Sequence, residues 1–176
     1  QSKALEILMT REMQKIELRY LDKKVKSIKN RTDKINKTYG IPKTSILSYI
    51  TQMKSFVKKV VTEKKCNNLS YWMMMDGYLE YMTHNHQVAQ SIFYQAKKGA
   101  LKETVLYDQI ELLEFANLLS LMNTMDENLE IQFGEILKNN KAFVKQLKNK
   151  SDFFMEKMGS LYAQKGDFAK AYLCNY

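Results

Sequence analysis

Two histidines and two cysteines are the residues best suited to metal or redox chemistry, but their spacing matches no known site. His84 and His86 lie two residues apart around Asn85, and a zinc site needs three or four such ligands. Cys66 and Cys174 are too few for a disulfide framework and match no metal-binding spacing. We therefore expect no metal and no cofactor, and we interpret the two histidines as polar turn residues.

An acidic stripe is the second candidate for chemistry. Asp108, Glu111 and Glu114 follow one another at intervals of three residues, so they share one face of a helix. We interpret them as a solvated face rather than as a general acid and base. The sequence also lacks a Ser-His-Asp arrangement, a glycine-rich phosphate loop and a dinucleotide fingerprint. We therefore expect a protein that is not an enzyme.

The positive charge of the chain is concentrated near its beginning. The net charge is +9, and residues 1–65 carry 17 basic and 6 acidic residues, a net of +11. The candidate anion-binding residues are Lys23, Lys24, Lys26, Lys29 and Arg31. This predicts, as an alternative function, a basic helical bundle that binds nucleic acid or an anionic surface through residues 23–65. A solvated basic face without a ligand would give the same pattern.

The composition favours an all-helical chain. Hydrophobic residues make up 45% of the 176 residues, methionine is abundant, and there is one proline and only six glycines. No apolar run is long enough to span a membrane, and no signal-peptide pattern opens the chain. Because the first residue is Gln1, we expect an excised or processed piece of a larger protein. We expect it to be soluble, in the cytoplasm or periplasm; the sequence indicates neither compartment nor oligomeric state.

Hydrophobic periodicity and helix breakers define the elements that must position any site. The pattern predicts helices over residues 2–38, 43–65, 70–83, 87–98, 103–123 and 128–138, followed by a helical hairpin over 152–176. We expect residues 1–66 to form a basic region, namely a long helix plus a second helix. Residues 67–176 should form one continuous helical-repeat region with hairpins at about 69–98, 103–138 and 152–176.

The C-terminal stretch carries the most informative pattern. Gly159 and Ala171 are small residues on two successive predicted helices, Tyr162 follows Gly159 by three residues, and Gly166-Asp167 stands where the apolar periodicity breaks. Glycine there can adopt the positive φ that ends a helix, and aspartate can cap the next helix. In this order and spacing, the stretch resembles about two thirds of a tetratricopeptide (TPR) repeat, which is roughly 34 residues long.

Residues 69–98 resemble a second repeat of this kind. Gly77 corresponds to Gly159, and Ala89, Phe93 and Ala96 stand at the small and aromatic positions of the second helix. Asp76 and Glu80 depart from the pattern, because apolar residues are expected at their positions. The resemblance implies stacked antiparallel helical hairpins, a TPR-like α-solenoid. The same periodicities permit a closed multi-helix bundle.

The resemblance also implies a function. First-helix residues of such repeats line a concave face, which here gives a peptide-binding set of Tyr71, Met74, Tyr78, Tyr81, Met82, Glu156 and Gln164. The expected function is a non-catalytic scaffold for protein or peptide recognition within a larger regulatory or sensory protein. Alternatively, residues 71–75 belong to the core, and Trp72 packs there or anchors an interface. A third possibility is a structural assembly piece that uses the first helix as a coiled-coil arm.

Overall fold

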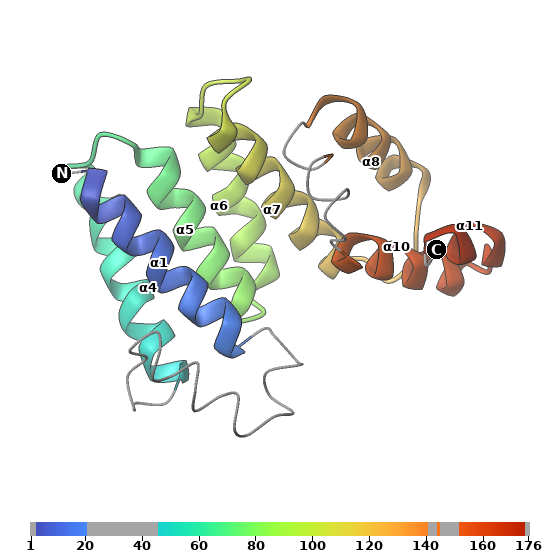
Figure 1. Cartoon of the computed structure of the whole chain (residues 1–176), viewed down its shortest axis with the longest axis horizontal. Coiled ribbons are helices and arrows are strands. Elements are labelled where there is room, and N and C mark those ends of the chain that lie inside the picture. The colour runs from blue at the N-terminus through green and yellow to red at the C-terminus, as the bar shows by residue number, and fades with distance from the viewer. Residues whose placement is uncertain (1–2, 21–45, 141–143, 145–151, 175–176) are drawn as a thin grey trace. The chain divides into compact units, whose positions relative to one another are not determined.

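A computed structural model describes residues 3–20, 46–140, 144 and 152–174 of the chain (Figure 1). All regular secondary structure among these described residues is helical, which confirms the all-α fold class. The helices are α1 (Lys3–Tyr20), α4 (Ile46–Glu63), α5 (Leu69–Met82), α6 (His86–Gly99), α7 (Val105–Leu121), α8 (Glu127–Asn139), α10 (Asp152–Lys165) and α11 (Phe168–Cys174). Their bounds lie within a few residues of the predicted helices. The second half of the helix predicted over 2–38 lies outside the described residues.

The chain divides into two compact units, and each is described by itself. The first unit is Gln1–Trp72 and the second is Met73–Tyr176. Helix α5 begins in the first unit and continues in the second. None of the helices in the described part of the chain combines the length and apolar character needed to cross a membrane.

In the first unit, α1 packs against α4 through apolar residues that recur at helical spacing. The buried residues are Met9, Met13 and Ile16 on α1 and Ile50, Val57 and Val60 on α4. Polar contacts fix the pair: the Tyr49 hydroxyl donates a hydrogen bond to Glu12, whose carboxylate also pairs with Lys15 at 2.7 Å.

The first turn of α5 completes this unit. The Tyr71 hydroxyl donates to the Glu6 carbonyl at 2.6 Å and lies 2.8 Å from the Thr10 hydroxyl. Trp72 is 1% exposed, and its ring meets those of Phe56 and Tyr71 edge-on at 5.9 and 5.5 Å. Trp72 therefore has the packing role that was one of its two expected roles.

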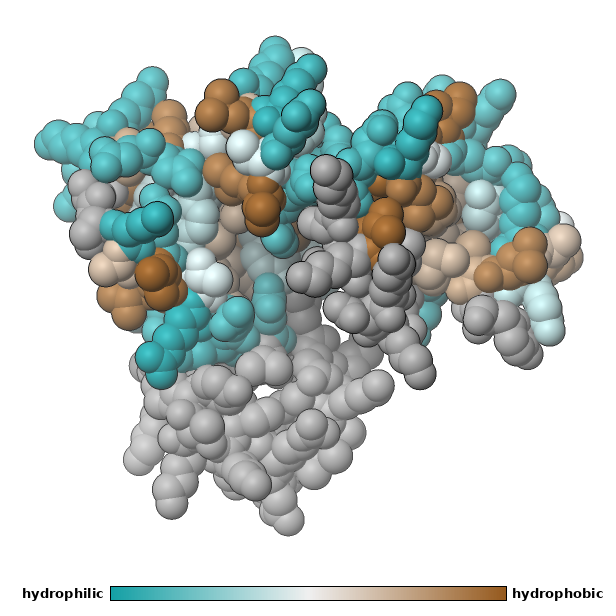
Figure 2. Space-filling view, turned by 45° about the horizontal axis from the view of Figure 1, so that its top comes forward, coloured by the Kyte–Doolittle hydropathy of each residue, from teal (hydrophilic) through white to brown (hydrophobic). Residues whose placement is uncertain are grey.

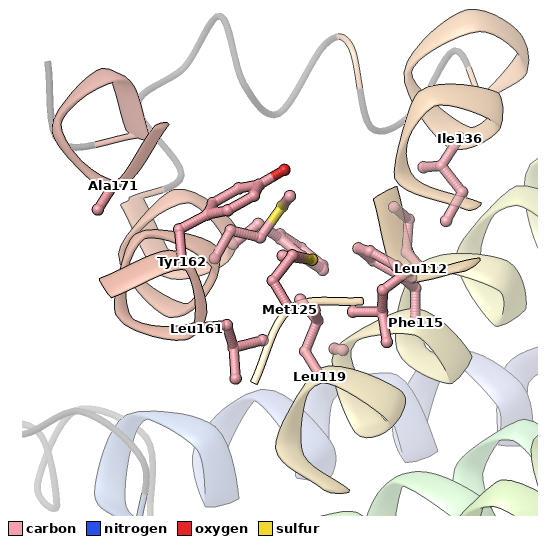
Figure 3. Close-up of a cluster of buried hydrophobic side chains, with 12 residues drawn as sticks. Leu112, Phe115, Leu119, Met125, Ile136, Leu161, Tyr162 and Ala171 are labelled. Carbon is pink, nitrogen blue, oxygen red and sulfur yellow. The ribbon is translucent and has the colours of Figure 1, made fainter. Parts of the chain in front are cut away.

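A hydrophobic cluster holds together the C-terminal part of the second unit (Figure 3). Phe115 of α7 stacks on Phe133 of α8 at 5.9 Å and on Phe154 of α10 at 6.1 Å. The buried members of the cluster are Leu112, Phe115, Ala116, Leu119, Met125, Leu129, Ile136, Phe154, Met158, Leu161, Tyr162 and Ala171. A backbone hydrogen bond from Met125 to Leu161 ties the α7–α8 connection to α10. Helices α7, α8, α10 and α11 thus share one core.

The connections use the residues that helix-capping chemistry requires. Gly166 has a φ of +87°, and the Asp167 carboxylate accepts from the Lys170 amide at 3.1 Å, so the predicted turn and cap are confirmed. Asp126 caps α8 by accepting from the Leu129 amide, and Thr104 caps α7 by accepting from the Tyr107 amide. These caps fix where each hairpin turns.

Small residues lie where neighbouring helices approach. A methyl group on Gly77 of α5 would lie 2.7 and 2.8 Å from two ring carbons of Phe93 on α6, closer than real contacts allow. Gly159 and Ala171 are also buried. Glycine at position 77 therefore lets an aromatic ring fill the space next to the α5 backbone.

On the face shown in Figure 2, apolar residues form separate groups among hydrophilic ones. Exposed apolar side chains on the second unit include Val88 and Tyr94 of α6, Ile131 of α8, and Phe168 and Tyr172 of α11. Isolated groups of this kind are normal on protein surfaces.

Candidate functional site

The structure separates the residues of the sequence-predicted peptide-binding set. Tyr71, Met74 and Met82 are only 8%, 5% and 0% exposed, so these three contribute to the core. Tyr78 and Tyr81 are half-buried, and Glu156 and Gln164 are exposed. The predicted anion-binding residues Lys23, Lys24, Lys26, Lys29 and Arg31 lie outside the described residues. A binding role for either set stays a prediction.

Tyr78 and Tyr81 are brought together with the two histidines of the α5–α6 turn. The tyrosine rings stack with their centroids 6.0 Å apart, and the ring of Tyr81 meets that of His86 edge-on at 5.4 Å. His84 lies 5.7 Å from His86, ring to ring. Burial raises the pKa of Tyr81, and a hydrogen bond with Ser120 opposes this shift. We call these four residues the aromatic ledge.

His86 is held by a buried asparagine on the neighbouring helix. Asn117 of α7 is 0% exposed, and its Nδ2 donates to the His86 carbonyl and to Gln90 Oε1, both at 2.8 Å. Its Oδ1 lies 2.9 Å from His86 Nδ1. Because Nδ2 is the donor in the first two bonds, Oδ1 is the acceptor in the third, and His86 Nδ1 carries the hydrogen. The histidine thus serves the α6–α7 contact, and the described residues contain no group of three or more potential metal ligands.

A pocket of about 470 Å³ lies between α6, α7 and α8 and is the candidate binding site of the second unit. Its lining comes from three helices: Gln90, Tyr94 and Lys97 on α6; Glu111, Glu114, Phe115 and Leu118 on α7; Gln132, Glu135, Ile136 and Asn139 on α8. We call this hollow the α6–α8 pocket. Ligand pockets in proteins typically have volumes of about 300–1,000 Å³.

Helical periodicity explains why these residues converge. The lining residues of each helix recur at intervals of three, four and seven, so each helix contributes one continuous stripe. On α7 the stripe passes from two glutamates to Phe115 and Leu118, and on α8 three polar residues surround Ile136. Phe115 and Ile136 are 3% and 6% exposed and belong to the core cluster, so the floor of the pocket is the edge of the hydrophobic core.

The wall of the pocket is charged and ion-paired. Lys97 Nζ lies 2.5 Å from Glu114 Oε2 and 3.9 Å from Glu111 Oε1. Burial lowers the pKa of Lys97, but the hydrogen bond and charge of Glu114 and the charge of Glu111 raise it by more, so the net pKa is raised. The ammonium group is therefore fixed in its charged form at neutral pH.

This arrangement corrects the interpretation of the acidic stripe as a solvated face. The side chains of Glu111 and Glu114 are only 23% and 14% exposed, and both pair with Lys97. The Asn140 side chain, from the end of α8, donates to Glu111 Oε2 at 3.0 Å and to the Asp108 carbonyl at 2.9 Å. The stripe was misread because its cationic and amide partners come from other helices, which local spacing does not show.

The α6–α8 pocket was not predicted from the sequence, although part of its signal is present there. Gln132, Glu135 and Asn139 put polar side chains on the same stripe of α8 as the buried Ile136, which is unusual for a purely packing face. Comparison of the chain with protein-family models, with curated proteins and with solved structures found no match.

Proposed function

We propose that this chain is a non-catalytic, TPR-like helical-repeat scaffold that recognises a protein or peptide through the α6–α8 pocket. Three features support the repeat assignment: the close contact at Gly77, the burial of Gly159 and Ala171, and the Gly166-Asp167 turn. Hairpins joined in this way expose grooves between successive helices, and partners commonly bind there.

The observation that carries the proposal is the mixed character of the pocket. Its floor is apolar, formed by Phe115, Leu118 and Ile136, and its rim holds amides and carboxylates. Apolar walls supply most of the binding free energy of such sites, and a few placed polar groups fix the orientation of the ligand. A side chain with an apolar stem and a polar end, presented by a peptide, fits this combination.

The aromatic ledge is a further contact surface in this proposal. Tyr78 and Tyr81 remain half-buried rather than fully enclosed, and tyrosine is enriched at protein interfaces because a rigid ring gives a large contact area at low entropic cost. These two residues are the part of the sequence-predicted peptide-binding set that keeps exposed aromatic surface.

The pocket is tested with two matched substitutions on α8. Gln132 lines the pocket and Asn128 does not, both are exposed, and lysine adds one positive charge at either position. Peptides are selected from a random library on the full chain, and their binding is measured by fluorescence anisotropy. Gln132→Lys should change the Kd about fivefold or more, roughly 1 kcal/mol, and Asn128→Lys should leave it nearly unchanged. Equal effects of the two substitutions, or no selected peptide, would contradict the proposal.

A second candidate function is binding of nucleic acid or an anionic surface by the basic first third of the chain. Lys58, Lys59, Lys64 and Lys65 at the end of α4 and in the following turn are all exposed, which favours it. Binding of a labelled DNA duplex by the full chain should then weaken linearly on a log–log plot against salt concentration. Absence of binding at low salt would eliminate this candidate.

A further inference from the structure

We infer that the α6–α8 pocket binds a lysine or arginine side chain of its partner, in competition with the protein's own Lys97. This inference rests on the proposed function, because it names the chemical class of the ligand for the same pocket. It follows from the charge, the shape and the existing cation contacts of the pocket.

The charge of the lining is one-sided. Three carboxylates, those of Glu111, Glu114 and Glu135, line the pocket together with a single ammonium group, that of Lys97. Lys97 pairs with Glu114 and Glu111, whereas no ion pair or hydrogen bond joins Glu135 to another residue in the described ranges, and Glu135 is exposed. The lining can therefore accept a second cation, and it opposes an anion.

The shape of the lining matches a long basic side chain. Lysine and arginine bury their methylene stems against apolar surface and keep the charged head at a polar edge. Phe115, Leu118 and Ile136 supply the apolar floor, and the amide oxygens of Gln132 and Asn139 can accept hydrogen bonds beside the Glu135 carboxylate. An ionised acidic side chain offers these acceptors no donor, and a neutral amide offers a donor but no charge to pair with Glu135.

A second and independent contact also points to a cation. Tyr94 lines the pocket, is 52% exposed, and already holds the ammonium group of Lys98 over its ring, 4.6 Å from the centroid. The negative face of the ring attracts cations. Lys98 itself does not line the pocket, so this contact shows only that the Tyr94 ring, which does line it, can bind a cation.

Lys97 is the cation that the pocket already holds in the free protein. Its side chain is 28% exposed and reaches two of the three carboxylates. An incoming lysine or arginine must share Glu111 and Glu114 with Lys97, so the resident ammonium weakens ligand binding. Removal of the Lys97 charge should therefore strengthen the binding of a basic ligand, a direction opposite to that expected if Lys97 contacts an acidic ligand.

The test uses the full chain and four pools of labelled peptides of one length. The flanking positions are random, and the central position is fixed as lysine, arginine, glutamine or glutamate. The lysine and arginine pools should bind more tightly than the glutamine pool, and the glutamate pool should bind least. Glu135→Gln should weaken the basic pools about fivefold, whereas Glu127→Gln, an equal loss of charge on the same helix but outside the pocket, should not.

The direction in which Lys97→Met changes the affinity for the basic peptides decides between a basic and an acidic ligand. It should tighten binding of the lysine and arginine pools severalfold; a loss of their binding in folded Lys97→Met protein would overturn the inference. If the glutamine or glutamate pool binds most tightly and Gln132→Lys changes its Kd, a basic ligand is refuted but peptide recognition through the pocket is not. If no pool responds to Gln132→Lys, both are refuted. Glu135→Gln keeps the inference testable if Lys97→Met does not fold.

Discussion

Replacement of Gly77 by alanine tests the close packing between α5 and α6. The added methyl group would lie 2.7, 2.8 and 3.2 Å from three ring atoms of Phe93, and contacts below 3.0 Å force a neighbour to move. Phe93 is 0% exposed, so its ring is enclosed on all sides and cannot turn away into solvent. The substitution therefore forces strain into the core of the second unit.

The magnitude follows from two opposing effects. Alanine favours a helix over glycine by about 1 kcal/mol, and an extra methyl group in a packed core typically costs about 1–3 kcal/mol. Because two ring carbons lie closer than 3.0 Å to the added methyl group, we expect the packing cost to exceed the gain in helix propensity. Gly77→Ala should lower the free energy of unfolding by about 1 kcal/mol net.

Gly134→Ala is the matched control. Gly134 lies within α8, and a methyl group there would meet nothing within 4 Å, so only the helix-propensity effect operates. This variant should gain about 0.5–1 kcal/mol. Urea unfolding of the full chain is followed by far-UV circular dichroism and by the fluorescence of Trp72, the single tryptophan, which lies on α5.

A double-mutant cycle identifies the contact itself. Phe93→Leu removes the ring atoms that the new methyl group would meet, so Gly77→Ala should be tolerated much better in that background, with a coupling of about 1 kcal/mol. If Gly77→Ala stabilises the wild-type protein as much as Gly134→Ala does, the reasoning about close packing is refuted.

Three further variants test polar contacts between helices by the same unfolding measurement. Asn117→Leu should lower the free energy of unfolding by about 1–3 kcal/mol, because it removes the hydrogen bonds to the His86 carbonyl and to Gln90. An unchanged stability would contradict the role of the buried asparagine. Tyr71→Phe should lower it by about 0.5–1.5 kcal/mol through loss of the bond to the Glu6 carbonyl, and no loss would show that this bond contributes nothing. Burial raises the pKa of Glu12, but hydrogen bonds from Lys15 and Tyr49 together with the charges of Lys15 and Arg11 lower it by more, so its net pKa lies below the ordinary 4.5. The Glu12 carboxylate therefore stabilises the fold above pH 4.5, and this contribution is lost as the pH falls through the folded-state pKa. Below about pH 4, the stability of Glu12→Gln should fall less steeply with pH than that of wild type. Parallel curves of stability against pH would contradict this.

The fold class was predictable because helical periodicity and capping chemistry are local. The turn at Gly166-Asp167 needed only a glycine at positive φ and an aspartate that could accept a backbone hydrogen bond, and both are visible in the sequence. Gly77 was identified as a small packing residue, and its contact with Phe93 shows why a side chain is not accommodated there.

The site was less predictable because its residues meet only after the helices pack. The peptide-binding set assumed a register for α5 in which Tyr71, Met74 and Met82 face outward, and all three are buried. Asp76 and Glu80 signalled the difficulty, since they stand where the resemblance requires apolar residues, and both are buried as well. The register of a helix depends on its neighbours, which a single sequence does not specify.

The α6–α8 pocket depends even more strongly on tertiary packing. Lys97 and Glu114 lie 17 residues apart on different helices, so no helical spacing relates them. Their ion pair exists because α6 packs against α7. The acidic stripe with Glu111 and Glu114 and the polar stripe of α8 were visible in the sequence, but neither indicates which neighbours it faces.

The most direct measurement of the central claim records the side-chain amide NMR signals of the full chain during titration with the lysine peptide pool. The signals of Gln90, Gln132 and Asn139, which line the pocket, should shift with a common Kd. Those of Gln87, Gln95 and Asn128, which are exposed outside it, should stay in place. Peptide binding that moves only the second set of signals, or leaves both sets in place, would contradict recognition through the α6–α8 pocket.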